Sequence, residues 1–179
     1  MGQGEDQRGS LTMPEHTITD VIDNVLESEG GSKATNDPKD KGGRTQYGIA
    51  ETSNPIAWID GKVTEEEARE IYEQKYVRGP GFDKLPDTYS RLRYQLVDFG
   101  VLSGPQLATE KLQAILGVKV DGQFGPKTLA AVLEQDPKVI NNKLVAERAR
   151  MIGRIVSKNP SQAKFIAGWL NRVTDFLSY

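Results

Sequence analysis

Amphipathic helical spacing dominates the pattern of hydrophobic and polar positions along the chain. The clearest instance is residues 17–29, where apolar side chains recur every three or four residues and form one helical face. These side chains are Ile18, Ile22, Val25 and Leu26. Thr17 or Thr19 can cap the start of this helix, and Gly30-Gly31 would end it.

Similar periodicity predicts further helices along most of the remaining chain. Their expected ranges are 64–77, 87–102, 105–117, 126–133, 137–158 and 161–178. Thr64 begins a capping box with Glu67, and Asn159-Pro160 separates the last two helices. Residues 32–50 instead contain turn formers and the strand-like run TQYGI. The pattern therefore predicts an α+β fold that is mainly α, with one small β element near the N-terminus.

Composition removes several classes of enzyme. The 179 residues include no cysteine and one histidine, His16, which lies in a polar leader. A disulfide scaffold, a Cys-containing zinc site and a cysteine nucleophile are excluded. A zinc hydrolase, which usually needs two or three His or Cys ligands, is disfavoured. We expect no cofactor and no metal, so carboxylates and hydroxyl groups must carry any chemistry.

The ends of the chain differ in charge and in expected role. Residues 1–16 are polar, lack the apolar core of a signal peptide and are expected to form a flexible tail. Residues 138–179 hold 8 basic and 2 acidic side chains, a net charge of +6 in a chain of net charge −2. This basic segment fits attraction to an anionic polymer, or simply a solvated helical face.

Glu29 is the strongest candidate for catalysis. It continues the apolar face of its helix and occupies the last turn, where the helix dipole disfavours negative charge. Burial and position both predict a raised pKa for this carboxyl group. A carboxylic acid that keeps its proton can protonate the leaving oxygen of a glycosidic bond. The alternative is an ordinary, partly exposed glutamate before a C-cap glycine.

The segment from Glu29 to Ile49 resembles the signature EGG…NDPxDxGGxTxYGI of the glycoside hydrolase 108 family. This family includes phage lysozymes and secretion-associated bacterial muramidases. The resemblance implies a lysozyme-like fold, in which the helix end that carries Glu29 faces a small N-terminal β-hairpin across the sugar cleft, with a helical C-terminal lobe. It also implies that Glu29 is the catalytic acid.

The same resemblance suggests roles for residues around the scissile bond. Asp40 and Thr45 would act on the opposite face of the sugar, by stabilising charge or positioning water. Asp37 competes for the acidic role and, with Tyr47 and Trp58, is expected to bind substrate. Turn formation is the alternative for both aspartates, and a calcium loop is a weaker one because the spacing differs from an EF-hand.

Resemblance to the family extends over about residues 17–175. DFGVLSGP at 98–105 resembles its D-x-x-x-N-x-G-P segment, but Leu102 replaces the usual Asn. Residues 112–132 resemble its type-3 peptidoglycan-binding region, although a packing role without a ligand is the alternative. GWLNR at 168–172 resembles its C-terminal segment, where we expect Trp169 to be a core anchor. The predicted organisation is a tail at 1–16, a catalytic region at 17–102 and a helical peptidoglycan-binding region at 103–179.

We therefore expect an N-acetylmuramidase that cleaves the β-1,4 bond between N-acetylmuramic acid and N-acetylglucosamine in peptidoglycan glycan strands. The expected setting is a bacteriolytic, antimicrobial phage endolysin, made in the host cytoplasm without a signal peptide and released through holin-type holes. We expect a monomer, no nucleic-acid partner and no stable membrane insertion. A lytic transglycosylase and a non-catalytic wall-binding protein are the main alternatives, and a nucleic-acid-binding protein rests only on the basic C-terminal segment.

Overall fold

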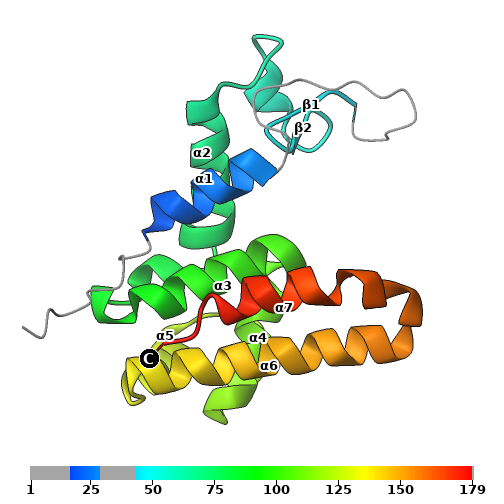
Figure 1. The fold of residues 1–179 in the computed structure, drawn as a ribbon. Coiled ribbons are helices and arrows are strands. Elements are labelled where there is room, and N and C mark those ends of the chain that lie inside the picture. The colour runs from blue at the N-terminus through cyan, green and yellow to red at the C-terminus, as the bar shows by residue number, and fades with distance from the viewer. Residues whose placement is uncertain (1–16, 29–42, 179) are drawn as a thin grey trace, which may run out of the picture.

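The computed structural model describes residues 17–28 and 43–178. A smaller part, with α1, α2 and the two strands, lies above a larger helical part that contains α3 to α7 (Figure 1). Among the described residues, the α-helices are α1 (Ile18–Ser28), α2 (Glu65–Glu73), α3 (Ser90–Ser103), α4 (Pro105–Leu116), α5 (Pro126–Leu133), α6 (Pro137–Lys158) and α7 (Ile166–Thr174). The predicted mainly α fold with one small β element is confirmed.

Short elements connect these helices. The two strands are β1 (Thr45–Gln46) and β2 (Ile49–Ala50), which pair antiparallel. Short 3-10 helices are η1 (Pro55–Trp58), η3 (Phe82–Lys84), η4 (Asp87–Tyr89) and η5 (Pro160–Phe165). The π-helical segment η2 (Gln74–Arg78) extends α2. The predicted helix 161–178 is therefore shorter than expected, because a 3-10 segment occupies its first turns and α7 ends at Thr174.

Capping side chains fix where two helices of the smaller part begin. In α1, Thr17 Oγ1 accepts from the backbone N–H of Asp20, and Asp20 accepts from that of Thr17. In α2, Thr64 and Glu67 form the predicted capping box, with the same reciprocal bonds. Each box satisfies donors that the first turn of a helix leaves without partners.

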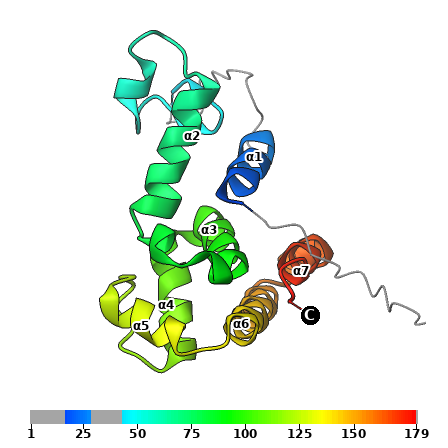
Figure 2. The ribbon, with the colours of Figure 1, turned by 90° about the vertical axis from the view of Figure 1, so that its left-hand side faces the viewer.

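One hydrophobic core joins the smaller and larger parts. The predicted face of α1 is buried through Ile22, Val25 and Leu26, and Val21 joins them. These side chains belong to the same cluster as buried residues of α2, α3, α4 and α6, and α3 contacts α1, α4 and α6. A second, smaller cluster of Val145, Ile152, Val173 and Phe176 holds α7 against α6. Figure 2 shows α1 and α7 on the side of α3 away from α5.

Candidate active site

The β-hairpin is the described element that carries most of the predicted site residues. Tyr47 and Gly48 form its two-residue loop, with φ of 51° and 72°. Positive φ at both central residues is the geometry of a type I′ turn, whose twist matches the paired strands. Glycine adopts this geometry at no steric cost, whereas tyrosine is strained there. The fold thus holds Tyr47 in an unfavourable backbone conformation at the tip of the hairpin.

Arg44 ties the hairpin to the segment that follows it. Its guanidinium forms a bidentate pair with Glu51, at 2.9 and 2.7 Å, and donates to the carbonyl of Gly61 at 3.1 Å. The same group lies 4.8 Å from the ring centroid of Trp58. Hydrogen bonding to Arg44 lowers the pKa of the Glu51 carboxyl group, although the pair is exposed to solvent.

Three further hydrogen bonds hold the hairpin against the segments that follow it. The indole N–H of Trp58 donates to the carbonyl of Ile49 at 3.2 Å, and the Tyr72 hydroxyl donates to that of Tyr47 at 3.1 Å. The Gln46 side chain accepts from the backbone N–H of Val63 at 2.9 Å. The position of the hairpin is therefore set by side chains from both its own strands and α2.

The structure brings together two of the predicted site residues. Thr45 lies in β1 opposite Ala50, and Tyr47 follows two residues later at the turn; both side chains are half-buried. Glu29, Asp37 and Asp40 lie outside the described residues. The last described residue of α1 is Ser28, which directly precedes Glu29.

Trp58 occupies a buried position beneath the hairpin. Only 4% of this residue is exposed, and its polar atom is already bonded to Ile49. This arrangement makes Trp58 a support for β2. Sugar stacking by Trp58 stays a prediction, and it would require the indole to become more exposed than it is here.

The described residues contain no group of three or more His, Cys, Asp or Glu side chains arranged to hold a metal ion. His16, Asp37 and Asp40 lie outside that part of the chain. Within the described residues, no helix has both the length and the apolar character needed to cross a membrane.

A self-contained polar network occupies the region that resembles a peptidoglycan-binding motif. Gln113, 1% exposed, donates to Asp121 and Thr128 side chains and to the carbonyl of Gln123. Its own carbonyl accepts from the backbone N–H groups of Asp121 and Gly122, both at 2.9 Å. These bonds fix the turn between α4 and α5. Phe124, in the same turn, is buried against Phe82.

Asp98 forms a buried ion-pair cluster that joins three helices. Its carboxylate accepts from Arg148 of α6 at 2.5 Å and from Arg172 of α7 at 2.8 and 2.6 Å. Burial lowers the pKa of Arg148, and the Asp98 carboxylate opposes that shift. Asp98 and Arg172 lie in the two segments, 98–105 and 168–172, that resemble family motifs. Their ion pair holds these two segments together.

Sequence reasoning did not single out Arg44, Gln46, Tyr72 or Arg148. All four act through long-range contacts that have no periodic signal in the sequence. Tyr72 and Arg148 occupy regular positions on helices, where neither the hydroxyl bond to Tyr47 nor the ion pair to Asp98 could be recognised. Arg44 and Gln46 lie within the signature segment, and their place in it is the only feature of the sequence that could have indicated a role for them.

Comparisons with known proteins agree with this architecture. Residues 22–104 match the family model described as Glycosyl hydrolase 108, and residues 107–174 match one described as Predicted Peptidoglycan domain. The chain is similar to the solved structure of Brucella abortus SagA, with 31% sequence identity over 88% of this chain and 90% of that chain and a TM-score of 0.63. No curated protein sequence matches the chain significantly. The fold is lysozyme-like, and the chain belongs to the glycosyl hydrolase 108 family of peptidoglycan hydrolases, with a peptidoglycan-binding region in its C-terminal half.

Proposed function

We propose that the protein is an N-acetylmuramidase that hydrolyses the β-1,4 bond between N-acetylmuramic acid and N-acetylglucosamine, with Glu29 as general acid. The observation that carries this proposal is α1, whose buried face ends at Val25 and Leu26 and whose last described residue precedes Glu29. A carboxyl group at the C-terminal end of a helix is driven toward its protonated form by the helix dipole. That form can protonate the bridging oxygen as the bond breaks.

The hairpin supplies the groups proposed for the other side of the reaction. Thr45 lies in β1, two residues before the strained turn, and can position a water molecule near the anomeric carbon. Asp40 would stabilise positive charge there or activate that water, with the separation of the Glu29 and Asp40 carboxyl groups deciding between retention and inversion. Tyr47, Asp37 and Trp58 are proposed to contact the sugars.

The chain is organised, in this proposal, as a tail at 1–16, a catalytic region at 17–102 and a peptidoglycan-binding region at 103–179. These act together as a monomer that lyses bacteria as a phage endolysin. Its route to the wall would be release from the cytoplasm through holin-type holes. Expression inside a bacterium with and without a membrane-permeabilising holin tests this role, because lysis should require both proteins.

Digestion of purified peptidoglycan tests the chemistry. Wild type, Glu29→Gln and the control Glu27→Gln would each be incubated with the polymer, and the reduced soluble fragments identified by mass spectrometry. Glu27 is an exposed residue of α1, so its substitution removes a carboxyl group from the same helix at a position to which the proposal gives no role. We expect reduced muramic acid ends from wild type and Glu27→Gln, and a rate lower by about a hundredfold or more for Glu29→Gln.

Other outcomes would assign the protein differently. Anhydromuramic ends would identify a lytic transglycosylase, which forms its product without water. Binding of the polymer with no release of fragments, from several peptidoglycan types, would identify a non-catalytic wall-binding protein. Equal activity of wild type and Glu29→Gln would remove Glu29 from its proposed role.

A further inference from the structure

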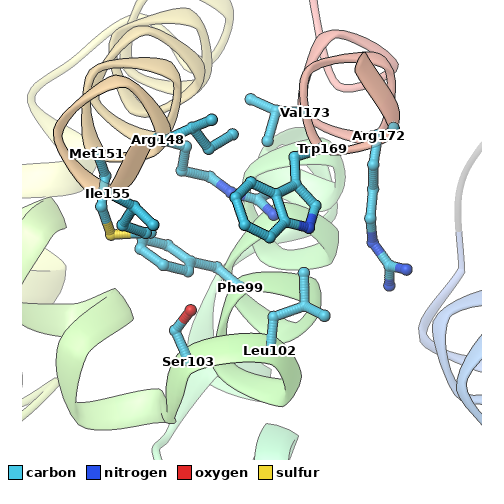
Figure 3. A pocket seen from close by; sticks show the side chains of 11 residues that line it. Phe99, Leu102, Ser103, Arg148, Met151, Ile155, Trp169, Arg172 and Val173 are labelled. Atoms are coloured by element: carbon cyan, nitrogen blue, oxygen red, sulfur yellow. The ribbon is translucent and has the colours of Figure 1, made fainter. Parts of the chain in front are cut away.

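An open groove of about 460 Å³ lies between α3, α6 and α7. Figure 3 shows its walls, which are mainly apolar: Phe99 and Leu102 come from α3, Met151 and Ile155 from α6, and Trp169 from α7. Leu102 is 55% exposed and Ile155 is 39% exposed. Apolar side chains that remain this accessible around a concave site are typical of a binding surface.

The groove is also electropositive. Arg148 and Arg172 line it, and both pair with Asp98, so two guanidinium groups against one carboxylate leave a net charge of +1. The surrounding chain is also basic. Residues 148–174 contain six Lys or Arg residues and no Asp or Glu, and two of the six, Arg150 and Arg154, pair with the adjacent Glu147. An anionic ligand would therefore be attracted to this face.

The floor of the groove holds a hydrogen-bond donor without an acceptor. Arg148 is 2% exposed, its guanidinium lies between the rings of Phe99 and Phe176, and its Nη1 has no hydrogen-bond partner among the described residues. Buried donors in proteins are nearly always paired, because an unmet donor is costly. A carboxylate or amide oxygen bound in the groove would be attracted by the charge of this guanidinium group, whose unpaired Nη1 lies buried beneath the groove.

The groove lies on the same helical face of α3 as the contact with α1. Tyr94, Asp98 and Leu102 are spaced four residues apart and share that face. Tyr94 accepts a hydrogen bond from Asn24 of α1 at 3.3 Å, Asp98 binds α7, and Leu102 borders the groove. The groove is therefore linked through α3 to the helix that leads to Glu29.

We propose that this groove binds the peptide stem of peptidoglycan, a short chain with carboxylates and small apolar side chains; this inference rests on the proposed function. The stem's methyl groups match the apolar walls, and its carboxylates match the net positive charge. A sugar chain fits less well, because carbohydrate recognition needs many hydrogen-bonding side chains and these walls offer few. The C-terminal region would thus recognise the peptide while the hairpin region cleaves the glycan.

Binding of the synthetic peptide N-acetyl-L-Ala-γ-D-Glu-L-Lys-D-Ala to the full chain tests the proposal by calorimetry. Its blocked N-terminus, like that of the stem in the polymer, leaves two carboxylates against one ammonium group and so a net negative charge. Leu102→Glu places a negative charge at the exposed rim and should weaken binding by about tenfold, more at low salt than at high salt. Leu102→Lys, at the same position, should bind at least as well as wild type. Val139→Glu is the matched control, because Val139 is a 48% exposed apolar residue of α6 that does not line the groove.

A second readout uses the polymer. Leu102→Glu should raise the KM for intact peptidoglycan more than the KM for peptide-free glycan, whereas Val139→Glu should change neither. The peptide holds no glycosidic bond, so its binding is independent of catalysis. If neither wild type nor any variant binds the peptide while peptidoglycan is still hydrolysed, the peptide-groove inference is wrong and the proposed function stands. Two other outcomes would give the groove a different ligand. If wild type does not bind the peptide but binds chitotetraose, and Leu102→Glu weakens that binding, the groove binds sugar. If the same pattern is seen with anionic phospholipid vesicles, the groove binds membrane. If wild type binds the peptide but does not hydrolyse peptidoglycan, the proposed function is wrong and the peptide-groove inference stands.

Discussion

Tyr47 is the residue at which local preference and observed conformation disagree. A tyrosine at φ 51° is strained by about 1 kcal/mol or more, and Asn or Gly would relieve that strain. The ring is half-buried and packs on the core, while the backbone carbonyl accepts from Tyr72 regardless of the side chain. Strain that persists at such a site suggests that the side chain itself is needed.

Tyr47→Asn separates strain from function. Relief of backbone strain should offset the lost ring packing, so the free energy of unfolding should change by less than about 1 kcal/mol. Hydrolysis of peptidoglycan should nevertheless fall, by about tenfold, if the ring contacts a sugar. Chemical denaturation and the initial digestion rate measure the two effects, and Tyr47→Phe is the control that keeps the ring. Unchanged activity in Tyr47→Asn would reduce Tyr47 to a structural residue.

At the scale of elements, side chains at the ends of helices decide much of the local structure. The boxes at Thr17 and Thr64 begin α1 and α2, and the Gln113 network fixes the turn between α4 and α5. Asp121 is central to that turn. Its carboxylate accepts from Gln113, and from the backbone N–H of Gln123, and these bonds lower its pKa from the usual 3.8.

Asp121→Asn should therefore show a pH-dependent loss of stability. A lowered pKa in the folded state means that the charged form stabilises the fold at pH above its unfolded pKa of about 4, and that this contribution is lost as pH falls through the folded value. The difference in unfolding free energy between wild type and Asp121→Asn should be constant from neutral pH to about 5 and shrink below about 4. Urea denaturation of wild type and Asp121→Asn at several pH values measures this difference in unfolding free energy. A difference that stays constant down to pH 3 would contradict a stabilised carboxylate.

At the scale of the whole molecule, the Asp98 cluster holds α3, α6 and α7 in one arrangement. The hydrogen bonds from Asn141 to the Phe176 carbonyl at 2.6 Å, and from Arg91 to the same carbonyl at 3.0 Å, fasten the end of the chain beside it. Both the groove between α3, α6 and α7 and the second hydrophobic cluster depend on this docking of α7. The cluster of Asp98 with Arg148 and Arg172 is therefore central to the architecture.

Asp98→Asn should destabilise the protein by about 3 kcal/mol, because it leaves the buried Arg148 without a counter-ion. Arg172→Gln should cost less, about 1 kcal/mol, since its side chain is 39% exposed and Arg148 still neutralises Asp98. Arg154→Gln is the surface control; its pair with Glu147 should contribute about 0–1 kcal/mol. Thermal and chemical denaturation rank the three variants. Equal losses for Asp98→Asn and Arg154→Gln would show that the buried cluster is not a structural tie.

Periodic spacing was sufficient to predict most helices and their buried faces. The stripe on α1 and the capping box at Thr64 occupy the predicted positions, and the helix expected at 87–102 is present as η4 followed by α3. Burial of one helical face is a local property of the sequence. The 3-10 start at Pro160 and the π segment after α2 were missed. Both depend on how a helix end meets its neighbours, which hydrophobic spacing does not encode.

For the site, the sequence by itself determined the family signature, the exclusion of cysteine chemistry and the candidate residues. It could not determine that Trp58 is buried under the hairpin, that Tyr47 is strained, or that Asp98 pairs with Arg148 and Arg172, 50 and 74 residues away. These features arise from contacts between residues distant in the sequence. Only the packing of α3, α6 and α7 decides which charged side chains are buried and which apolar side chains remain exposed in the groove. The free-energy cost of burying a charge depends on whether neighbouring residues supply a counter-ion and hydrogen bonds.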